Sequence, residues 1–564
     1  MADKAASVFG VARTAGSAPE ARPMARADRL HAIEQSAKSA RLRIAALRLA
    51  LRPGARAHYD GRVDAATKRL KSGIGRSPDV ILRRFRVGGD GPEALCAFVD
   101  GLAENQMVDQ DLMLLAERAG AAAQAPRGKA RADAVAEHLS VGHVTSTRKW
   151  SDIVAKILAG NAVLLVEGAD RALVLDTVKY PARPIASPDA ERSVLGSHEG
   201  FNEILLTHMN QVRRYVQSPA LRFESMTFGS LTGTKAVLVY VDGVTNPAIL
   251  HAVRRRLEGM KDSTVLSVTR LASTLKDHRW TPFPLVRQTP RVDFVAREVA
   301  EGRVAILVAN SPFALIVPAT FLDFYRTAED YEGQFWGPTL DRLVRLGAFL
   351  IALYAPALYV ALSEVNPDFM PTRLLWTVAG SRENLPFPPQ IEVLIMFGVF
   401  EILREAALRM PSQMSTALST VGAVIIGTAV VKAGIVSTLI IVVVAIGALG
   451  VFTAPTWEAT ITTRWIFWPM VASAYLYGLA GMAVFTVVLL LHMASLSSFG
   501  VPYLSPFGPL RTRDWADSIL RAPLRDMRRR PSRLFTLDPR TEPRSAPAAT
   551  EPDVPLAAAR RRRT

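Results

Sequence analysis

Five ionisable side chains interrupt one otherwise apolar stretch, from Ile391 to Met410. They are Glu392, Glu401, Arg404, Glu405 and Arg409. A charge inside the hydrocarbon layer of a membrane is unfavourable, so such groups usually mark a buried or water-filled site. On a helix Glu401 lies one turn from Arg404, three residues on, and Glu405 lies one turn from Arg409, four residues on, so each pair can neutralise itself. Two interpretations stay open for Glu401, Arg404 and Glu405: charges at the level of the lipid headgroups, or a role in coupling and gating.

The stretch from Ser415 to Val431 has the composition of a helix that packs closely or lines a pore. It is rich in Ser, Thr, Gly, Ala and Val and contains no aromatic residue. Small side chains let helices approach one another, and ordinary packing is one interpretation. In the other, a symmetric ring of such helices encloses a narrow passage that gates by dewetting, with Lys432 at its mouth. The pore-lining candidates are Ser415, Ser419, Gly422, Gly427, Thr428, Val431 and Lys432.

The sequence contains no residue pattern typical of an enzyme. It has no Gly-rich phosphate loop with a Lys, no nucleophile elbow, and no His, Cys or Asp cluster at metal-ligand spacing. The single cysteine, Cys96, is expected to be a small buried side chain. We therefore predict that the protein is not an enzyme and uses no cofactor or metal.

Four stretches are long and apolar enough to cross a bilayer. They are Leu343 to Leu362, Met414 to Val431, Ala433 to Phe452, and Ile466 to Leu491. The charged stretch near 391–410 is predicted to be a re-entrant or interfacial helix, because a full crossing would bury its charges. Four crossings place the two ends of the chain on the same side of the membrane.

The formal net charge of +17 is unevenly distributed along the chain. Basic residues concentrate before residue 90 and after the last apolar stretch, which is the placement expected of cytoplasmic segments that meet anionic lipid. This distribution argues against a nucleic-acid partner. Residues 1–76 are predicted to be a basic, partly disordered N-terminal arm, and residues 511–564 an Arg-rich cytoplasmic tail.

An internal repeat lies between these ends. Residues 97–101 (Ala-Phe-Val-Asp-Gly) match residues 239–243 (Val-Tyr-Val-Asp-Gly), and Gly160 and Gly302 each precede an apolar strand, all at an offset of 142 residues. A repeat of this kind predicts two copies of one α/β domain. The copies are placed at 77–180 and 223–335, with a Pro-rich connector and motif helix at 181–222 and the membrane part at 336–510. The predicted fold class is an α/β tandem-repeat soluble domain followed by an all-α multispan transmembrane domain.

Five blocks, in order along the chain, resemble the GerA family of bacterial spore germination proteins. The blocks are Glu199-Gly200-Phe201-Asn202-Glu203, Leu238 to Pro247, Glu301 to Val308, Ser311 to Pro318, and Ser498 to Pro506. The resemblance covers the chain from about Ser77 to Arg533. It is spread over most of the sequence, which makes it specific.

The resemblance implies a multi-pass protein of the spore inner membrane with both terminal regions cytoplasmic. It implies an A-type subunit of a nutrient germinant receptor that forms a homo-oligomeric, gated ion channel and works with a transporter-like B-type subunit and a lipoprotein C-type subunit. Two alternatives remain, an AF-type accessory channel and a non-conducting scaffold. The candidate subunit contacts are Glu199, Gly200, Phe201, Asp242, Gly243, Asn246 and Pro247.

Overall fold

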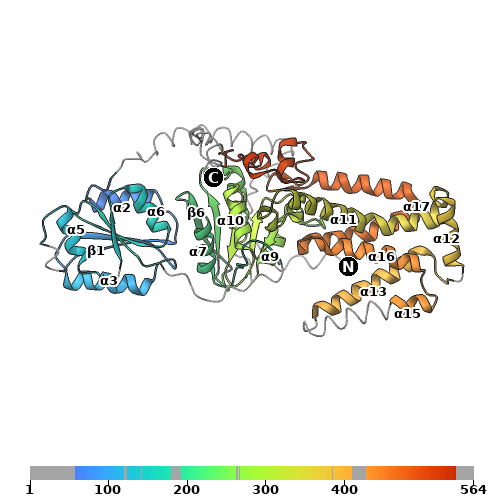
Figure 1. The fold of residues 1–564 in the computed structure, drawn as a ribbon, viewed down its shortest axis with the longest axis horizontal. Helices are drawn as coiled ribbons and strands as arrows, with labels where there is room; N and C mark the ends of the chain where they lie inside the picture. Colours follow the sequence, from blue (N-terminus) through green and yellow to red (C-terminus); the bar gives the residue numbers. More distant parts are fainter. Residues whose placement is uncertain are drawn as a thin grey trace, which may run out of the picture.

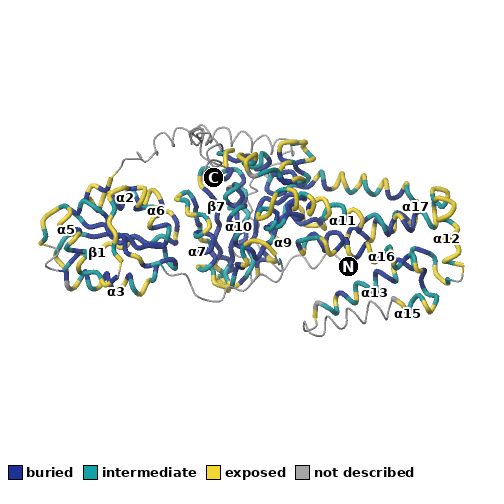
Figure 2. Tube along the Cα trace, in the orientation of Figure 1, coloured by how far each residue is buried: buried dark blue, intermediate teal, exposed yellow. Residues whose placement is uncertain are grey.

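Three parts follow one another along the long axis of the molecule: a first sheet, a second sheet and a group of helices (Figure 1). The computed structural model describes residues 58–119, 124–141, 143–178, 191, 194–261, 265, 267–383, 385–409 and 427–541. Both sheets lie in a buried interior, and exposed positions gather in the loops and on the outer faces of the helices (Figure 2).

The first domain is a five-stranded antiparallel sheet covered on both faces. Its strands, in the order β1, β2, β4, β5, β3, are Val80–Arg86, Glu93–Val99, Ala162–Val166, Ala172–Leu175 and Val144–Thr147. Helices α2 (Val63–Ser72) and α6 (Trp150–Leu158) pack on one face. Helices α3 (Asn105–Arg118) and α5 (Lys129–Ala136) pack on the other. Because both faces are buried, the central strands are almost continuously apolar.

Helix α2 corrects the predicted start of this domain. It lies within the residues assigned to the N-terminal arm, yet Val63, Ala66 and Leu70 are buried in the core. The periodicity of this short helix is obscured by its many basic residues, which face outward. The folded domain therefore includes Tyr59 and does not begin at residue 77.

The second domain has the same strand order as the first. Its strands, in the order β6, β7, β9, β10, β8, are Leu221–Phe228, Thr234–Val241, Val304–Val308, Ala314–Val317 and Arg287–Thr289. Helices α7 (Leu205–Tyr215) and α10 (Val292–Ala300) cover one face, and α8 (Pro247–Glu258) and α9 (Val268–Leu275) cover the other. Strands β5 and β10 differ in position by the predicted offset of 142 residues.

A buried ion pair joins the two α/β domains. Arg213 of α7 contacts both carboxylate oxygens of Asp79, which precedes β1, and its Nη2 lies 2.8 Å from Oδ2. Beside this pair, Arg222 of β6 donates to the carbonyl of Gly73 at 2.6 Å. The β6 edge of the second sheet therefore faces the first domain.

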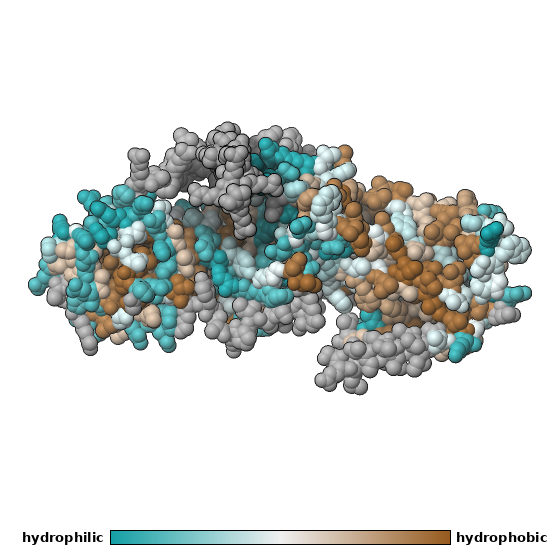
Figure 3. All heavy atoms as spheres, in the orientation of Figure 1, coloured by the Kyte–Doolittle hydropathy of each residue, from teal (hydrophilic) through white to brown (hydrophobic). Residues whose placement is uncertain are grey.

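The helical part carries most of the apolar surface of the molecule (Figure 3). Its helices are α11 (Trp336–Val360), α12 (Thr372–Arg382), α13 (Pro389–Arg409), α15 (Gly427–Lys432), α16 (Thr438–Phe452) and α17 (Trp457–Ser495). Among the described residues, two helical stretches are long and apolar enough to cross a membrane, Trp336–Val365 and Trp457–Ser495. We call the end of this part that meets the second domain proximal, and the opposite end distal.

Helix α17 reverses direction at Gly478, so the predicted single span from Ile466 to Leu491 is wrong. Gly478 has φ 58° and ψ −138°, which are not helical angles. Thr462 donates to the carbonyl of Pro282 at 3.0 Å, and His492 lies 2.9 Å from the hydroxyl of the adjacent residue, Thr281. In a straight helix, positions 30 residues apart are separated by about 45 Å. The two arms of α17 are therefore antiparallel, with their turn at the distal end.

Glycine is required at this turn. A Cβ atom on Gly478 would lie 1.9 Å from the side-chain oxygen of Asn366, which accepts a hydrogen bond from the backbone of Leu479 at 2.9 Å. The positive φ angle adds a second reason, because L-residues with a side chain rarely adopt it. The reversal escaped the sequence prediction because Gly478 lies inside a long apolar run that has no charge or proline near the turn.

Helix α13 is continuous over 21 residues. It is not among the helices of the described part that are long and apolar enough to cross a membrane, and its assignment as a re-entrant or interfacial helix stays a prediction. At its start Glu392 accepts a hydrogen bond from the backbone of Ser437, just before α16, and farther along Phe400 contacts Phe452 at the end of α16. The helix therefore runs beside α16 from the distal toward the proximal end. Its charges form ion pairs.

The segment after α17 folds back onto the second domain. It contains the short strands β11 (Ser497–Ser498) and β12 (Val501–Pro502) and the 3-10 helices η7 (Thr512–Asp517), η8 (Leu524–Asp526) and η9 (Ser532–Leu534). Leu537 donates to the carbonyl of Val244 at 2.9 Å, and Arg530 donates to that of Ala300 at 2.9 Å. The predicted tail is therefore folded as far as 541, and residues 542–564 lie outside the described part.

Candidate coupling site

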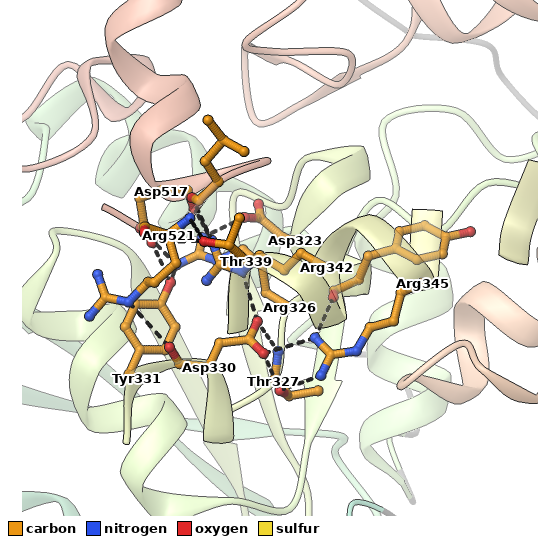
Figure 4. A network of polar contacts seen from close by, with 12 residues as sticks. Asp323, Arg326, Thr327, Asp330, Tyr331, Thr339, Arg342, Arg345, Asp517 and Arg521 are labelled. Carbon is orange, nitrogen blue, oxygen red and sulfur yellow. Dashed lines mark hydrogen bonds and ion pairs between the residues drawn. The ribbon is translucent and has the colours of Figure 1, made fainter. Parts of the chain in front are cut away.

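A cluster of buried arginines and carboxylates lies where the second domain, the start of α11 and the C-terminal segment meet (Figure 4). We call it the arginine network. Its members are Glu298, Glu301, Arg303, Asp323, Arg326, Asp330, Tyr331, Arg342, Arg345, Asp517, Arg521 and Arg533. They come from α10 and the turn between α10 and β9, from the loop after β10 that contains η2 (Phe321–Tyr325) and η3 (Glu329–Tyr331), from α11, and from the segment after α17.

Asp323 is the carboxylate on which the second domain and the C-terminal segment converge. Its backbone position is fixed by a capping box with Thr320 at the start of η2. Arg303 and Arg326 of the same domain lie 2.8 and 3.0 Å from its oxygens, and Arg533 of the C-terminal segment lies 3.2 Å away. Burial alone would raise the pKa of Asp323, but these guanidinium groups outweigh burial and hold its pKa well below the ordinary value.

Asp517 makes the second link to the C-terminal segment. Arg326 places Nη2 3.1 Å from its Oδ2, and the Tyr331 hydroxyl donates to its Oδ1 at 2.8 Å. Burial would raise the pKa of Asp517, but Arg326 and Arg342 overcome that effect and lower it. The carboxylate is therefore ionised at neutral pH.

Asp330 links the network to the first helix of the helical part. Arg342 of α11 approaches its Oδ2 at 2.9 Å, and Arg345, one turn later, approaches its Oδ1 at 2.8 Å. Arg342 also donates to the backbone carbonyl of Asp517 at 3.1 Å. One arginine of α11 thus contacts both the second domain and the C-terminal segment.

The two glutamates of the network differ in their protonation. Glu298 lies 2.7 Å from Nε of Arg303. Burial raises its pKa, but Arg303 and Arg326 overcome this and hold it below the ordinary value. Glu301 is more weakly paired, since its oxygen lies 4.0 Å from the guanidinium of Arg326. Burial, reinforced by the neighbouring Glu298 charge, raises the pKa of Glu301 to about 7.

The arrangement of these groups suits mechanical coupling rather than catalysis. The network combines permanently charged guanidinium groups with carboxylates that are mostly ionised. Removing one partner from such a pair leaves an uncompensated buried charge, at a cost of about 3–5 kcal/mol. No group of three or more His, Cys, Asp or Glu side chains that could hold a metal occurs in the described part of the chain. The network therefore fixes the position of α11 relative to the second domain.

The predicted contact residues of the first motif lie against their own chain. Glu199 is buried and pairs with Arg214, and the carbonyl of Gly200 accepts from Gln211 at 3.1 Å. Phe201 donates its backbone N–H to Pro290 at 2.8 Å, and its ring packs against His208. These contacts hold the connector on α7 and beside α10.

The second motif forms the turn between β7 and α8. Gly243 has φ +80°, and Asn246 is fully buried, where it caps α8 and donates to the carbonyl of Phe535 at 3.1 Å. Pro247 occupies the first position of α8. The side chain of Asp242, in the same turn, is solvent-exposed, and its Oδ2 lies 3.7 Å from Nε of Arg222. Asn246 and Phe201 are therefore occupied within the chain, and a contact of these motifs with a second subunit stays a prediction.

The structure describes only some of the pore candidates. Ser415, Ser419 and Gly422 lie outside the described residues. Thr428 and Lys432 are exposed on α15, and Val431 is partly buried. Helix α15, which begins at Gly427, is joined by a short turn to the distal start of α16.

The charges of α13 form the expected pairs. Glu401 lies 2.8 Å from Arg404, and Glu405 lies 2.6 Å from Arg409. Glu401 also accepts from Arg464 in the first arm of α17, with Nε 2.8 Å from Oε1. This second partner of Glu401 was not predicted, because no local spacing connects positions in two different helices.

The arginine network itself was missed by the sequence reasoning. Its members come from four separated segments, and neither Arg342 nor Arg345 was singled out in the sequence. The available signal was the density of Arg and Asp just before the first span and just after the last one. Read with the positive-inside rule, those residues indicated a lipid-facing flank rather than a folded interface.

Comparison with known proteins identifies relatives over most of the chain. The sequence profile described as Bacillus/Clostridium GerA spore germination protein matches residues 68–533. Spore germination protein KA of Bacillus subtilis (strain 168) is 34% identical over 456 residues, covering 80% of this chain and 83% of that protein. Spore germination protein GerLA of Bacillus cereus is 30% identical over 485 residues, covering 86% of this chain and 98% of that protein.

One solved structure is also similar in sequence. It is the N-terminal domain of the A subunit of the Bacillus megaterium spore germinant receptor GerK3, 27% identical to this chain. The match covers 47% of this chain and 97% of that structure, with a TM-score of 0.37.

Proposed function

Because the chain belongs to the GerA family of spore germination proteins, we propose that it is the A-type subunit of a nutrient germinant receptor. In this proposal it oligomerises into a gated ion channel of the spore inner membrane. The two α/β domains, copies of one ancestral unit, form the cytoplasmic part. A transporter-like B-type subunit and a lipoprotein C-type subunit supply the nutrient signal.

We propose that the helical part crosses the membrane several times. Helix α11 leads from the proximal to the distal end, α13 and α16 each lead back toward the proximal end, and the two arms of α17 run one each way. An even number of passes, such as the four predicted from sequence, leaves both terminal regions on one side. We propose that this side is the cytoplasm.

The arginine network is the observation that carries the coupling proposal. A signal received by the soluble domains can open a pore only if it stabilises open and closed arrangements differently. Arg342 and Arg345 hold the first helix to Asp330, and Arg326 holds the same loop to Asp517. A rotation of the second domain would therefore move α11 and the C-terminal segment together.

Pore lining is proposed for the segment that includes α15. Thr428 and Lys432 are exposed in the single chain, which leaves them accessible to neighbouring copies in a ring. The test is ion flux from liposomes that contain the full-length chain, alone and with its B- and C-type partners. Substitution of Val431 by Asp should produce a leak or a block if the segment lines the pore. A protein that inserts and assembles but passes no ions under any condition is a scaffold.

A further inference from the structure

A single tryptophan projects from the second domain without any covering side chain. Trp280 is 99% exposed and lies in the turn that joins α9 to β8. Arg279, the preceding residue, is also exposed. A fully exposed Trp beside an exposed Arg is unusual on a soluble surface and typical of a membrane–water interface, where the indole ring is half in lipid and half in water.

The turn that carries Trp280 is attached to the proximal ends of two apolar helical arms. The next two residues, Thr281 and Pro282, contact His492 and Thr462 in the second and first arms of α17. These contacts fix the depth of the turn relative to the apolar surface. Trp280 therefore lies where α17 leaves its apolar environment.

Other exposed tryptophans lie at the proximal ends of helices. Trp457 and Trp465, in the first three turns of α17, are 55% and 67% exposed, and Trp336, at the start of α11, is 72% exposed. A ring of interfacial aromatic residues is the usual anchor of a membrane protein at the headgroup level. Trp280 extends that ring from the helices to the soluble domain.

The sheet topology places the turn on the membrane side of the second domain. Strand β8 is the edge nearest the helices, since Gln288 donates its backbone N–H to Glu458 of α17 at 3.2 Å. Strand β6 is the opposite edge and faces the first domain through Arg222. Leu231, in the turn between β6 and β7, is 94% exposed on that far side and has no such relation to the helices.

We propose that the turn at Trp280 is a lipid-binding anchor: the indole ring inserts among the headgroups of the bilayer, and Arg279 binds the phosphate of an anionic phospholipid. The anchor rests on the proposed membrane location of the helical part. It gives the second domain two attachments to the membrane region, the arginine network and this turn. With both in place, the domain can rotate about the line between them but cannot lift away from the bilayer.

The test uses tryptophan fluorescence of the full-length chain in vesicles of phosphatidylglycerol and phosphatidylcholine. Subtracting the signal of a Trp280→Phe variant isolates the contribution of Trp280. Lipids with a nitroxide on the headgroup should quench this contribution more strongly than lipids labelled deep in the acyl chain, and aqueous acrylamide should quench it weakly. Trp457 and Trp465 report on membrane insertion in the same sample.

Reversing the charge of Arg279 distinguishes binding of an anionic headgroup from mere closeness of Trp280 to the bilayer surface. Arg279→Glu should reduce headgroup quenching of the Trp280 contribution in phosphatidylglycerol vesicles and leave it unchanged in pure phosphatidylcholine. Arg86→Glu makes the same charge change on an exposed position of the first domain and should have no effect in either.

Two outcomes overturn the inference, and they are distinguishable. If the remaining tryptophans are quenched by lipid while Trp280 is quenched by acrylamide, the turn is in water and the anchor is wrong, although the membrane proposal stands. If lipid quenches none of the tryptophans, the membrane proposal itself fails. Equal headgroup quenching of Arg279→Glu and the unchanged chain in anionic vesicles would contradict the phosphate contact.

Discussion

Arg326 and Asp517 are 191 residues apart in sequence, and their side chains form a buried ion pair of 3.1 Å. Arg326 follows the last strand of the second domain, and Asp517 follows the last apolar helix. Every residue of the helical part lies between them. Their contact therefore closes the helical part into a loop whose two ends are both held on the second domain.

The first prediction concerns this pair. Asp517→Asn keeps the shape of the side chain but removes one buried counter-charge of Arg326 and Arg342, which retain Asp323 and Asp330 as partners. Breaking such a buried ion pair should cost about 3–5 kcal/mol. Urea unfolding of the full-length chain in detergent measures the loss. Asp242→Asn is the matched control. Asp242 is 57% exposed and lies 3.7 Å from Arg222, and exposed ion pairs contribute only about 0–1 kcal/mol to stability. Equal losses in the two variants would contradict the importance of the network.

The second prediction is a pH dependence that originates at Glu301. Its pKa is about 7 in the folded chain and about 4.3 in an unfolded one. The folded state therefore binds this proton more tightly. Its contribution to stability is complete below about pH 4.3 and is lost as the pH rises through about 7.

Glu301→Gln removes this titration and mimics the protonated form. Relative to the unchanged chain, the variant should gain thermal stability as the pH rises from about 4.3 to about 7, and the gain should level off above that. Melting curves of both proteins over this range provide the measurement. A difference in melting temperature that stays constant with pH would show that Glu301 does not titrate in this window.

The third prediction concerns the contact between the two α/β domains. Asp79→Asn should weaken the contact with Arg213, whose side chain is 2% exposed, and should loosen α7. Hydrogen exchange followed by mass spectrometry should then show faster exchange in peptides that cover Leu205–Tyr215. Asp109→Asn removes an exposed pair with Arg83 in the first domain and should leave those peptides unchanged.

The fourth prediction concerns the C-terminal segment. Gly302 has φ +104°, and a Cβ atom there would lie 2.6 Å from Thr536. Gly302→Ala should therefore displace the segment and expose its arginines to trypsin. Gly128 has a similar φ of +100°, but a Cβ atom added there would meet no other atom within 4 Å. Gly128→Ala therefore tests the backbone strain alone, which destabilises the fold by about 1–3 kcal/mol. Similar cleavage of the segment in both variants would attribute the effect to strain.

The sequence predicted the parts of the fold that depend on local pattern. The apolar runs at 162–166 and 304–308 are strands β4 and β9, and Asp242-Gly243 forms the expected turn. Short edge strands such as β3 and β8 were missed. Each has only three or four residues, mostly polar or charged like Arg287, and so shows no alternation of apolar and polar side chains. The pairs within α13 were predictable because helical geometry fixes residues three and four apart.

Contacts between distant segments were not predictable in the same way. Nothing local distinguishes Arg342, buried against Asp330, from the exposed basic residues that flank many membrane helices. The hairpin of α17 was hidden for a related reason. The run around Gly478 is apolar throughout, and only the contacts of Thr462 and His492 with the same turn reveal the reversal.

The most direct test of the proposed coupling is ion flux through the reconstituted receptor. Full-length chains carrying no substitution, Asp517→Asn or Asp109→Asn are inserted in liposomes with their B- and C-type partners, and ion release is recorded with and without the nutrient. Asp109 forms an exposed pair with Arg83 in the first domain, so we expect nutrient-dependent release from the unchanged chain and from Asp109→Asn. Asp517→Asn should release ions without the nutrient or fail to respond to it. Normal insertion and assembly without any ion release, or a response of Asp517→Asn identical to that of the unchanged chain, would contradict the account.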